Sequence, residues 1–344
     1  MTDTSFLVIR LSHLGDIVLT TGVLDYWHRK HGWTFYFVTT QSMLPILLEH
    51  PAIIDVISVT QAEKPFWPWL RFCGFLRKRY GNIPLIDLHG TLRSSMLGAM
   101  WPSRVFRYPK LRGSRRLYQY FRHEPSRKRL DAINVPQRYS LAREPVAPSS
   151  RELVPRIFLR DQDQTWARKV LAPLGDHPLV ALHPYATHKA KQWPREHWCE
   201  LVSRLHAKGI KTLIIGQSEV PFVRPDSDPC EPTPALPDLD LTNETNLAQT
   251  SAILKQVQVL VSGDSGPMHL GTAVGTPVVA LFGPTCRQWG FYPSGPRDKV
   301  ISMNTPCSPC SLHGKGNCSR DIACMREINV TTVLDAILNR INRI

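Results

Sequence analysis

The sequence lacks several features that would place the protein in a membrane or assign it a common cofactor. No apolar run approaches the ~18 residues that a membrane span requires. The first apolar run, residues 6–9, ends at Arg10 and is soon followed by Asp16, unlike a secretory leader. No strand-to-helix turn carries G-x-G-x-x-G with a suitable acidic residue after it, which disfavours an NAD-dependent enzyme. We therefore expect a cytoplasmic protein that is not integral to a membrane.

Acidic residues are also scarce, and the resulting positive charge is unevenly spread. The 344 residues carry a formal net charge of +14 at pH 7. The segment from Arg71 to Arg138 contains 16 Lys or Arg against three Asp or Glu, so it holds +13 of that charge. Such an excess predicts an anionic partner, namely nucleic acid, an acidic membrane face or a phosphorylated substrate. A solvated basic face would give the same composition.

Cysteine is better represented, and four of the eight cysteines form a cluster. Their spacing is Cys307-x2-Cys310-x7-Cys318-x5-Cys324. Because cytoplasmic chains rarely hold disulfide frames, the cluster is interpreted as a structural metal site or as reduced structural thiols. One C-x2-C pair favours a metal, but the second pair lacks that spacing.

The apolar pattern predicts two α/β domains. A chain of 344 residues with 42% hydrophobic residues can bury two cores. Predicted strands alternate with predicted helices in a first half (strands 6–11, 33–39, 56–59 and 84–88; helices 17–27, 42–49 and 68–79). After a linker-like stretch at 144–150 the pattern restarts (strands 179–182, 211–215, 257–261 and 276–282; helices 163–171, 195–207, 250–256, 267–274 and 329–344). We predict two Rossmann-like, doubly wound domains facing a cleft, with ligands at the carboxyl ends of the strands.

Asp16 is the first candidate for chemistry. It lies in the turn after the first predicted strand, beside Gly15, where a substrate can approach closely. A carboxylate there can act as a general base towards a hydroxyl group. The same residue type would also cap a helix beginning near Ile17, and this segment leaves both interpretations open.

The second half offers two loops suited to phosphate. In residues 183–194, Thr187 supplies a hydroxyl group and Lys191 a point charge, although a solvated loop would look similar. In residues 257–285, a glycine turn leads through Asp264 and Ser265 into a helix with Pro267 at its first position. Backbone N–H groups at such a helix start bind anions. The alternatives are an empty tight turn and, for His269, a place in the core.

Together these segments resemble glycosyltransferase family 9, the bacterial heptosyltransferases of lipopolysaccharide core assembly. The resemblance rests on Arg10-x-Ser12-x-x-Gly15-Asp16, Lys191-x-Trp193-Pro194, Asp264-Ser265-Gly266-Pro267-Met268-His269 and Phe282-Gly283-Pro284-Thr285. It spans nearly the whole chain and is weakest over residues 104–150 and 220–240. Residues 307–325 also resemble a cysteine-rich stretch found in many members.

The resemblance implies a GT-B enzyme that inverts configuration at the sugar without a catalytic metal or other cofactor. Residues 1–155 would bind the acceptor, residues 156–328 a nucleotide-diphospho-sugar, typically ADP-heptose, and the helix 329–344 would pack back on the first domain. Asp16 would be the general base. The donor and its phosphates would contact Thr187, Lys191, Asp264, Ser265, Gly266, Pro267, Met268 and His269, with Glu219 at the ribose. Acceptor contacts would come from Arg10, Ser12, His13 and Arg93.

The expected acceptor is a phosphorylated glycolipid. The basic segment from Arg71 to Arg138 would hold it against the acidic inner face of the inner membrane, so we expect a peripheral enzyme and no nucleic-acid partner. Two alternatives stay open. One is a nucleotide-sugar epimerase on the same scaffold, because fold does not fix the reaction. The other is a nucleic-acid-binding protein that uses the basic segment and a zinc-bound cysteine cluster.

Overall fold

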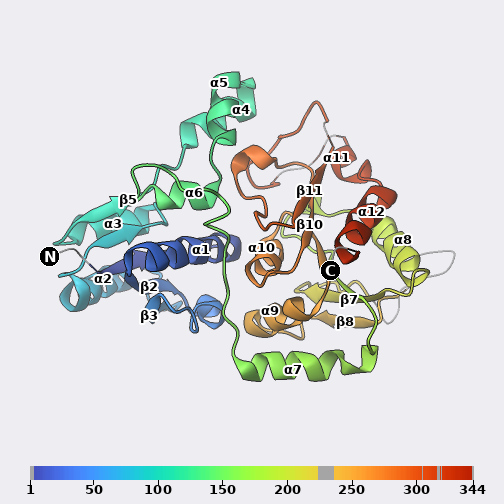
Figure 1. Cartoon of the computed structure of the whole chain (residues 1–344). Coiled ribbons are helices and arrows are strands. Elements are labelled where there is room, and N and C mark those ends of the chain that lie inside the picture. Colours follow the sequence, from blue (N-terminus) through green and yellow to red (C-terminus); the bar gives the residue numbers. More distant parts are fainter. Residues whose placement is uncertain (1–3, 224–235, 304, 316–317, 319, 343–344) are drawn as a thin grey trace. The chain divides into compact units, whose positions relative to one another are not determined.

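The chain forms two compact units, each built on one parallel sheet (Figure 1). The computed structural model describes residues 4–223, 236–303, 305–315, 318 and 320–342. The first unit comprises the chain up to Arg112 together with Ile133–Phe158, and the second comprises Gly113–Ala132 together with the chain from Leu159 onward. The predicted α/β class with two parallel sheets is confirmed.

The first unit has a five-stranded parallel sheet in the order β3-β2-β1-β4-β5. Its strands are β1 (Ser5–Ile9), β2 (Thr34–Thr40), β3 (Ile53–Val59), β4 (Leu85–Asp87) and β5 (Val105–Arg107). Its helices are α1 (Leu14–His31), the 3-10 helix η1 (Gln41–Ile46), α2 (Phe66–Tyr80), α3 (Leu92–Met100) and α6 (Val135–Ser140). The strand order reverses between β1 and β4, so the loops after these two strands diverge there and leave a place for a ligand.

The second unit has a six-stranded parallel sheet in the order β11-β10-β9-β6-β7-β8. Its strands are β6 (Leu179–His183), β7 (Lys211–Gly216), β8 (Leu239–Thr242), β9 (Val259–Gly263), β10 (Val278–Phe282) and β11 (Lys299–Ser302). Its helices are α4 (Arg112–Phe121), α5 (Glu124–Asp131), α7 (Asp161–Leu171), α8 (Arg195–His206), α9 (Leu247–Gln256), α10 (Gly266–Ala273), α11 (Ala323–Arg326) and α12 (Val330–Ile341), with 3-10 turns η2 (Ala172–Leu174), η3 (Lys189–Lys191) and η4 (Arg287–Trp289). Here the order reverses between β6 and β9.

The sequence-based elements agree with the structure where apolar runs are long, and they fail where the elements are short. The predicted helix at 42–49 is the 3-10 helix η1, with Pro45 inside it, because proline removes a helical donor. The strands β5, β8 and β11 and the helix α3 were not predicted. Each of these strands has only three or four residues, too few to show a period. Within the described ranges, every helix is too short or too polar to cross a bilayer.

Helices α4 and α5 correct the predicted first domain, which was drawn as residues 1–155. They group with the second unit. Arg122, between them, donates to the carbonyl oxygens of Pro309 at 2.8 Å and Cys307 at 3.0 Å. The ring of Tyr118 meets that of Trp289 edge-on, with centroids 6.0 Å apart. The basic segment is therefore divided between the two units.

The last helix is expected to pack back on the first domain over residues 329–344, and the structure shows its apolar stripe. Residues 343 and 344 lie outside the described residues. The apolar stripe of α12, with Val333, Leu334 and Ile337, is buried in the same core as Val259 and Val279 of the second unit. The apolar stripe of α12 therefore completes the core of the second unit, and the packing of this helix on the first domain stays a prediction.

The close approach of α1 to the segment before Phe158 yields a prediction about stability. A Cβ atom at Gly22 would lie 2.4 Å from the carbonyl oxygen of Leu153 and 2.5 Å from that of Val154. These are backbone atoms, so Gly22→Ala should lower the free energy of unfolding by about 1–3 kcal/mol. Urea denaturation followed by circular dichroism measures this change.

Gly74→Ala is the matched control, because Gly74 also lies inside a helix of the first unit. Nothing lies within 4 Å of its added Cβ, so alanine should be neutral or stabilise by up to about 1 kcal/mol. Equal effects of the two substitutions would contradict the packing argument.

Candidate active site

The first candidate site lies at the strand-order reversal of the first unit. Arg10 directly follows β1, and its Nη1 atom donates to the carbonyl oxygen of Leu88, after β4, at 2.5 Å. Its Nη2 atom is 2.5 Å from Oδ2 of Asp16. Because α1 begins at Leu14, Asp16 is the third helical residue, and its Oδ2 also accepts the backbone N–H of His13 at 3.3 Å. Asp16 therefore does stabilise the helix start, but as the third residue and not as the cap.

Tyr139 completes this arrangement, and the sequence reasoning missed it. Its hydroxyl group, carried by α6, donates to Oδ1 of Asp16 at 2.8 Å. Its ring lies 5.6 Å from the guanidinium carbon of Arg10. Tyr139 is 1% exposed, whereas the Asp16 side chain retains 13%. Since 123 residues separate Tyr139 from Asp16, no local pattern could have paired them.

The protonation state of Asp16 follows from these contacts. Burial, the largest influence, would raise the pKa of its carboxyl group. The charge of Arg10 and the donors from Tyr139 and His13 outweigh burial and hold the pKa below its ordinary value. Burial raises the pKa of Tyr139 well above its ordinary value, which keeps its hydroxyl group a donor. At neutral pH Asp16 is thus a carboxylate with both oxygens positioned.

Further cations surround the loop after β4. Lys110 donates to the carbonyl oxygens of His89 at 2.5 Å and Gly90 at 2.7 Å, and Arg112 donates to that of Gly90 at 2.9 Å. Burial, together with the charges of Arg112 and Arg10, lowers the pKa of Lys110 to about 8. These residues make the edge of the sheet around Asp16 suited to an anionic group.

The residues expected to contact the acceptor lie in two places. Ser12 and His13 share the loop after β1 with Arg10 and Asp16. Arg93 lies at the start of α3, and its Nη2 atom donates to the carbonyl oxygen of Lys64 at 2.9 Å. Arg93 therefore lies where the starts of α2 and α3 meet, beside the loop after β4 and not in the loop after β1.

The second candidate site lies at the strand-order reversal of the second unit. Lys191, in the loop after β6, has its Nζ atom 2.7 Å from Oδ2 of Asp264, after β9. Thr285, after β10, donates its hydroxyl group to the same oxygen at 2.7 Å. The Lys191 and Asp264 side chains keep 15% and 14% exposure. Three motifs that are far apart in sequence thus converge on one carboxylate.

The start of α10 lies beside this pair. Ser265 is the N-cap, and Gly266 is the first helical residue, one position earlier than predicted. The Oγ atom of Ser265 lies 3.2 Å from Nδ1 of His183, whose pKa burial lowers to about 4. Neutral His183 is therefore a fixed polar support beneath the helix start, and sequence reasoning gave it no role.

Two residues of the same motif turn their side chains into the core. Met268 is fully buried and His269 is 3% exposed, so the side chain of His269 occupies a core position, as its alternative interpretation held. Their contacts with a donor stay a prediction. Thr187 and Glu219 are exposed in the loops after β6 and β7, and their roles stay predictions.

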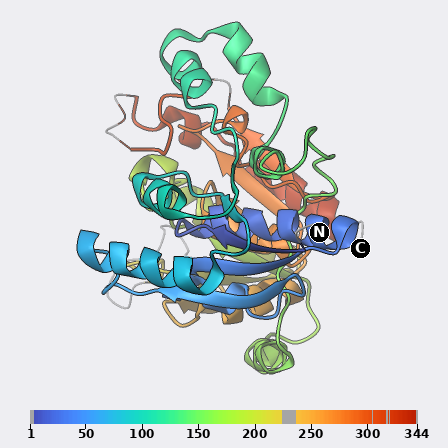
Figure 2. The ribbon, with the colours of Figure 1, turned by 90° about the vertical axis from the view of Figure 1, so that its left-hand side faces the viewer.

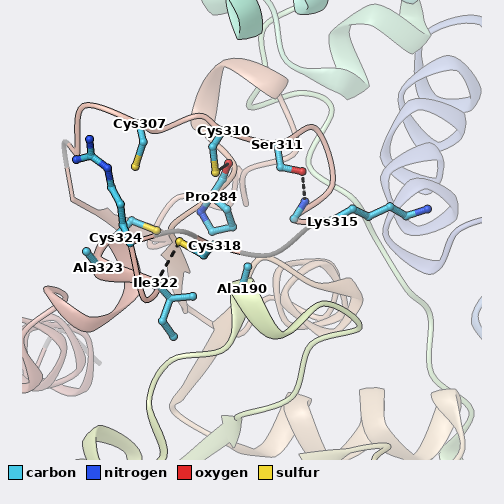
Figure 3. Close-up of a pocket in the computed structure, with 12 residues that line it drawn as sticks. Ala190, Pro284, Cys307, Cys310, Ser311, Lys315, Cys318, Ile322, Ala323 and Cys324 are labelled. Atoms are coloured by element: carbon cyan, nitrogen blue, oxygen red, sulfur yellow. Dashed lines mark hydrogen bonds between the residues drawn. The ribbon is translucent and has the colours of Figure 1, made fainter.

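The four clustered cysteines line one cavity of about 110 Å³. Figure 3 shows the thiol groups of Cys307, Cys310, Cys318 and Cys324 turned towards the same hollow. Burial first, and then the neighbouring thiols, raise the pKa of Cys324 to about 11. Across the part of the chain that the structure describes, no three His, Cys, Asp or Glu side chains gather as a metal ligand set. The metal site therefore stays a prediction.

The cysteine loop supports the second candidate site. The backbone N–H groups of Cys310 and Ser311 both donate to the carbonyl oxygen of Pro284 at 3.2 Å. A Cβ atom at Gly314 would lie 2.8 Å from carbon atoms of the Lys191 side chain. The loop thus packs against both Lys191 and the turn that carries Thr285.

Comparison with known proteins shows the family of the chain. Residues 75–317 match the family described as "Glycosyltransferase family 9 (heptosyltransferase)". The chain is 27% identical over 323 residues to Lipopolysaccharide heptosyltransferase 1 of Pseudomonas aeruginosa, covering 88% of this chain and 85% of that protein. With Lipooligosaccharide heptosyltransferase 2 of Haemophilus influenzae it shares 31% identity over 128 residues, 35% of this chain and only 36% of that protein.

Solved structures show the same fold. A family 9 glycosyl transferase from Veillonella parvula aligns with a TM-score of 0.77 at 18% identity, over 99% of this chain and 98% of that one. The ADP-heptose lipopolysaccharide heptosyltransferase II of Escherichia coli gives 0.71 at 18%, over 98% and 99%. TibC of enterotoxigenic E. coli, an iron-containing dodecameric glycosyltransferase, gives 0.58 at 15%, over 99% and 76%. With the family match spanning most of its length and this two-sheet GT-B architecture, the chain belongs to glycosyltransferase family 9, the heptosyltransferase family.

Proposed function

We propose that the protein transfers a heptose from ADP-heptose to a lipopolysaccharide core acceptor, with inversion at the sugar and without a catalytic metal. The observation that carries this proposal is the ionised carboxylate of Asp16, which Arg10 and Tyr139 hold in place at the strand-order reversal of the first unit. The Lys191–Asp264 pair at the other reversal supplies a matching phosphate-type site. Support for the donor comes from the E. coli relative, which is described as an ADP-heptose enzyme.

Asp16 acts as the general base in this proposal. It takes the proton from an acceptor hydroxyl group, whose oxygen attacks the anomeric carbon from the face opposite the diphosphate. The bond between that carbon and the diphosphate oxygen breaks, and ADP leaves. Arg10 and Tyr139 fix the direction of the carboxylate. This lowers the entropic cost of reaching the geometry in which the proton is transferred.

The second unit stabilises the charge that grows on the leaving diphosphate. Lys191 has three N–H donors, so a diphosphate can bind to it while Asp264 still holds its position. The start of α10 adds backbone N–H groups and the positive end of the helix dipole. Thr187 contributes a hydroxyl group to the phosphates, and Glu219 contacts the ribose.

The first unit would hold the acceptor. Arg10, Lys110 and Arg112 surround the loop after β4, and they suit the phosphate groups of a core glycolipid. Ser12 and His13 follow the carboxyl end of β1, and Arg93 follows that of β4. All three would make further contacts with the acceptor. The basic residues of this unit would also keep the enzyme on the acidic inner face of the membrane, and nucleic acid is not a partner.

We further propose that Cys307, Cys310, Cys318 and Cys324 hold a structural metal. Four thiols form a ligand set suited to zinc or iron, and all four line one cavity. The solved structure of TibC is described as iron-containing. When bound, such a metal would cross-link the loop that packs against Lys191, and it would take no part in the transfer.

The transfer proposal predicts the behaviour of Asp16→Asn. Amide nitrogen cannot accept the proton, so kcat with ADP-heptose and a core acceptor should fall by about 10²–10⁴-fold. The affinity for ADP, measured by calorimetry, should not change, and ADP should bind more tightly than UDP or GDP. Asp25→Asn is the matched control, because Asp25 is also a buried carboxylate of α1, paired with Arg29 at 2.9 Å.

Near-normal turnover of Asp16→Asn would show that another group is the base. Consumption of the donor without any acceptor would indicate an epimerase and would contradict the transfer itself.

The contact from Tyr139 predicts a shift in the pH profile. Tyr139→Phe removes a donor that favours the ionised form, so the pKa of Asp16 should rise. The activity, which needs the carboxylate, should then be lost at a higher pH as the pH falls. The acidic limb of the kcat profile measures this, with Tyr26→Phe, also a tyrosine of the first unit, as the control. If kcat of Tyr139→Phe is lower but the acidic limb of its profile lies at the same pH as in the wild type, the role of Tyr139 is purely structural.

The metal proposal predicts about one metal ion per chain in the purified protein, measured by mass spectrometry of the elements. Cys310→Ser should lose the ion, lower the thermal midpoint and raise KM for the donor more than kcat changes, because the loop packs on Lys191. Cys286→Ser, which changes a free cysteine outside the cluster, should keep the ion. A metal-free wild-type protein in which all four clustered cysteines are reduced would show that they are structural thiols only.

A further inference from the structure

Helix α2 displays aromatic and basic side chains on its outer face. Trp67 is 71% exposed and Phe75 is 51% exposed, and Arg71 lies between them. Residues four apart fall on one side of a helix, so these three form a single stripe. The opposite face, with Trp69, Cys73, Leu76 and Tyr80, is buried in the core of the first unit. In Figure 2, α2 runs along the outside of that unit.

Within α2 and the two residues before it the charge has one sign, and Asp55 of β3 acts on Arg79 near the end of the helix. Residues 64–80 contain five Lys or Arg and no Asp or Glu. Arg71 and Lys78 are both exposed on α2. Basic residues at the end of a helix also complement its dipole, but that effect does not account for Arg71 or for the exposed aromatic rings beside it.

Helix α3 extends the patch at the carboxyl edge of the sheet. Leu92, its first residue, is 78% exposed, and Phe66, the first residue of α2, is 57% exposed. Two hydrogen bonds tie these helix starts together: Trp69 Nε1 donates to the carbonyl oxygen of Arg93 at 3.2 Å, and Arg93 donates to that of Lys64 at 2.9 Å. The loop after β4, which borders the Asp16 site, leads directly into α3. The patch therefore lies at the rim of the proposed acceptor site.

A second helix has a similar composition but belongs to the second unit. In α4, Tyr120 is 71% and Phe121 is 76% exposed. Two of the basic residues that follow it are engaged within the second unit. Arg122 binds the carbonyl oxygens of the cysteine loop, and Arg127 pairs with Glu124 at 2.6 Å and Asp131 at 3.4 Å. The α4–α5 segment also keeps exposed Arg116, Lys128 and Arg129, so the two helices match in exposed aromatic and basic surface and differ in that only α2 belongs to the first unit.

We propose that the α2–α3 face, defined as Phe66, Trp67, Arg71, Phe75, Lys78 and Leu92, docks on an anionic lipid bilayer. The aromatic rings and Leu92 enter the interfacial region, where amphipathic rings are favoured. Arg71 and Lys78 meet lipid phosphates while their aliphatic stems stay against the rings. This proposal rests on the proposed function, because it states how the enzyme reaches an acceptor that is itself anchored in the bilayer.

The test measures sedimentation of the full-length protein with vesicles, and it needs no turnover. The wild-type protein should bind vesicles of phosphatidylglycerol and phosphatidylethanolamine, and it should bind neutral phosphatidylcholine vesicles far more weakly. Arg71→Glu/Lys78→Glu should reduce the partition coefficient by at least about 30-fold, since each basic residue near an anionic surface contributes about fivefold. Trp67→Ser/Phe75→Ser should reduce it by about tenfold or more. Transfer to a soluble, delipidated acceptor should not change in either variant.

Tyr120→Ser/Phe121→Ser in α4 is the matched control, and it should bind vesicles as the wild type does. The proposal is overturned if the α2 variants keep wild-type binding, or if only the α4 variant loses it. It is also overturned if the α2 substitutions dissociate an oligomer in sedimentation velocity, because the face would then be an interface between copies of the chain. If the α2 variants lose vesicle binding but the wild-type protein transfers no sugar, the proposed function is refuted and the docking face still stands.

Discussion

The reversal of strand order in a parallel sheet is the constraint on which both candidate sites depend. Each sheet is wound outward from a central strand in two directions, β1 in one unit and β6 in the other. Neighbouring loops diverge only where the winding changes direction, between β1 and β4 and between β6 and β9. Asp16 lies in the first turn of the helix that follows the central strand of its sheet, and Lys191 lies in the connection after the central strand of the other sheet. Their positions follow from the topology before any side-chain chemistry is considered.

At each of these places a carboxylate and a cation are already paired. Asp16 is held by Arg10 and Tyr139, and Asp264 is held by Lys191 and Thr285. Breaking one partner of a largely buried pair leaves an uncompensated charge, which is strongly destabilising. The pairs therefore keep both sites polar and rigid without a ligand. The two sites differ in the group that the pair presents to a ligand. In the first unit it is the oriented carboxylate of Asp16, and in the second it is the ammonium group of Lys191, which donates hydrogen bonds.

The basic segment illustrates how composition and folded surface diverge. Its sixteen positive charges look continuous from Arg71 to Arg138 in the sequence. In the fold, Arg122 fastens the α4–α5 connection to the cysteine loop of the second unit, and Arg127 pairs within α5. Lys110 and Arg112 support the loop beside Asp16. The residues on α2 are left with exposed aromatic neighbours and no acidic residue in their segment. A single electrostatic excess thus serves packing, a candidate site and an exposed face.

The sequence by itself determined the class of the fold, most of the long elements and the motifs at Asp16, Lys191 and Asp264. Long apolar runs and glycine turns are local signals, so they can be recognised in the sequence without knowledge of the tertiary structure. The tertiary structure alone placed Tyr139 on Asp16 and Thr285 on Asp264, moved α4 and α5 into the second unit, and buried His269 and the stripe of α12. These outcomes depend on which distant segments compete for the same buried surface. That competition is decided by packing, which no local pattern records.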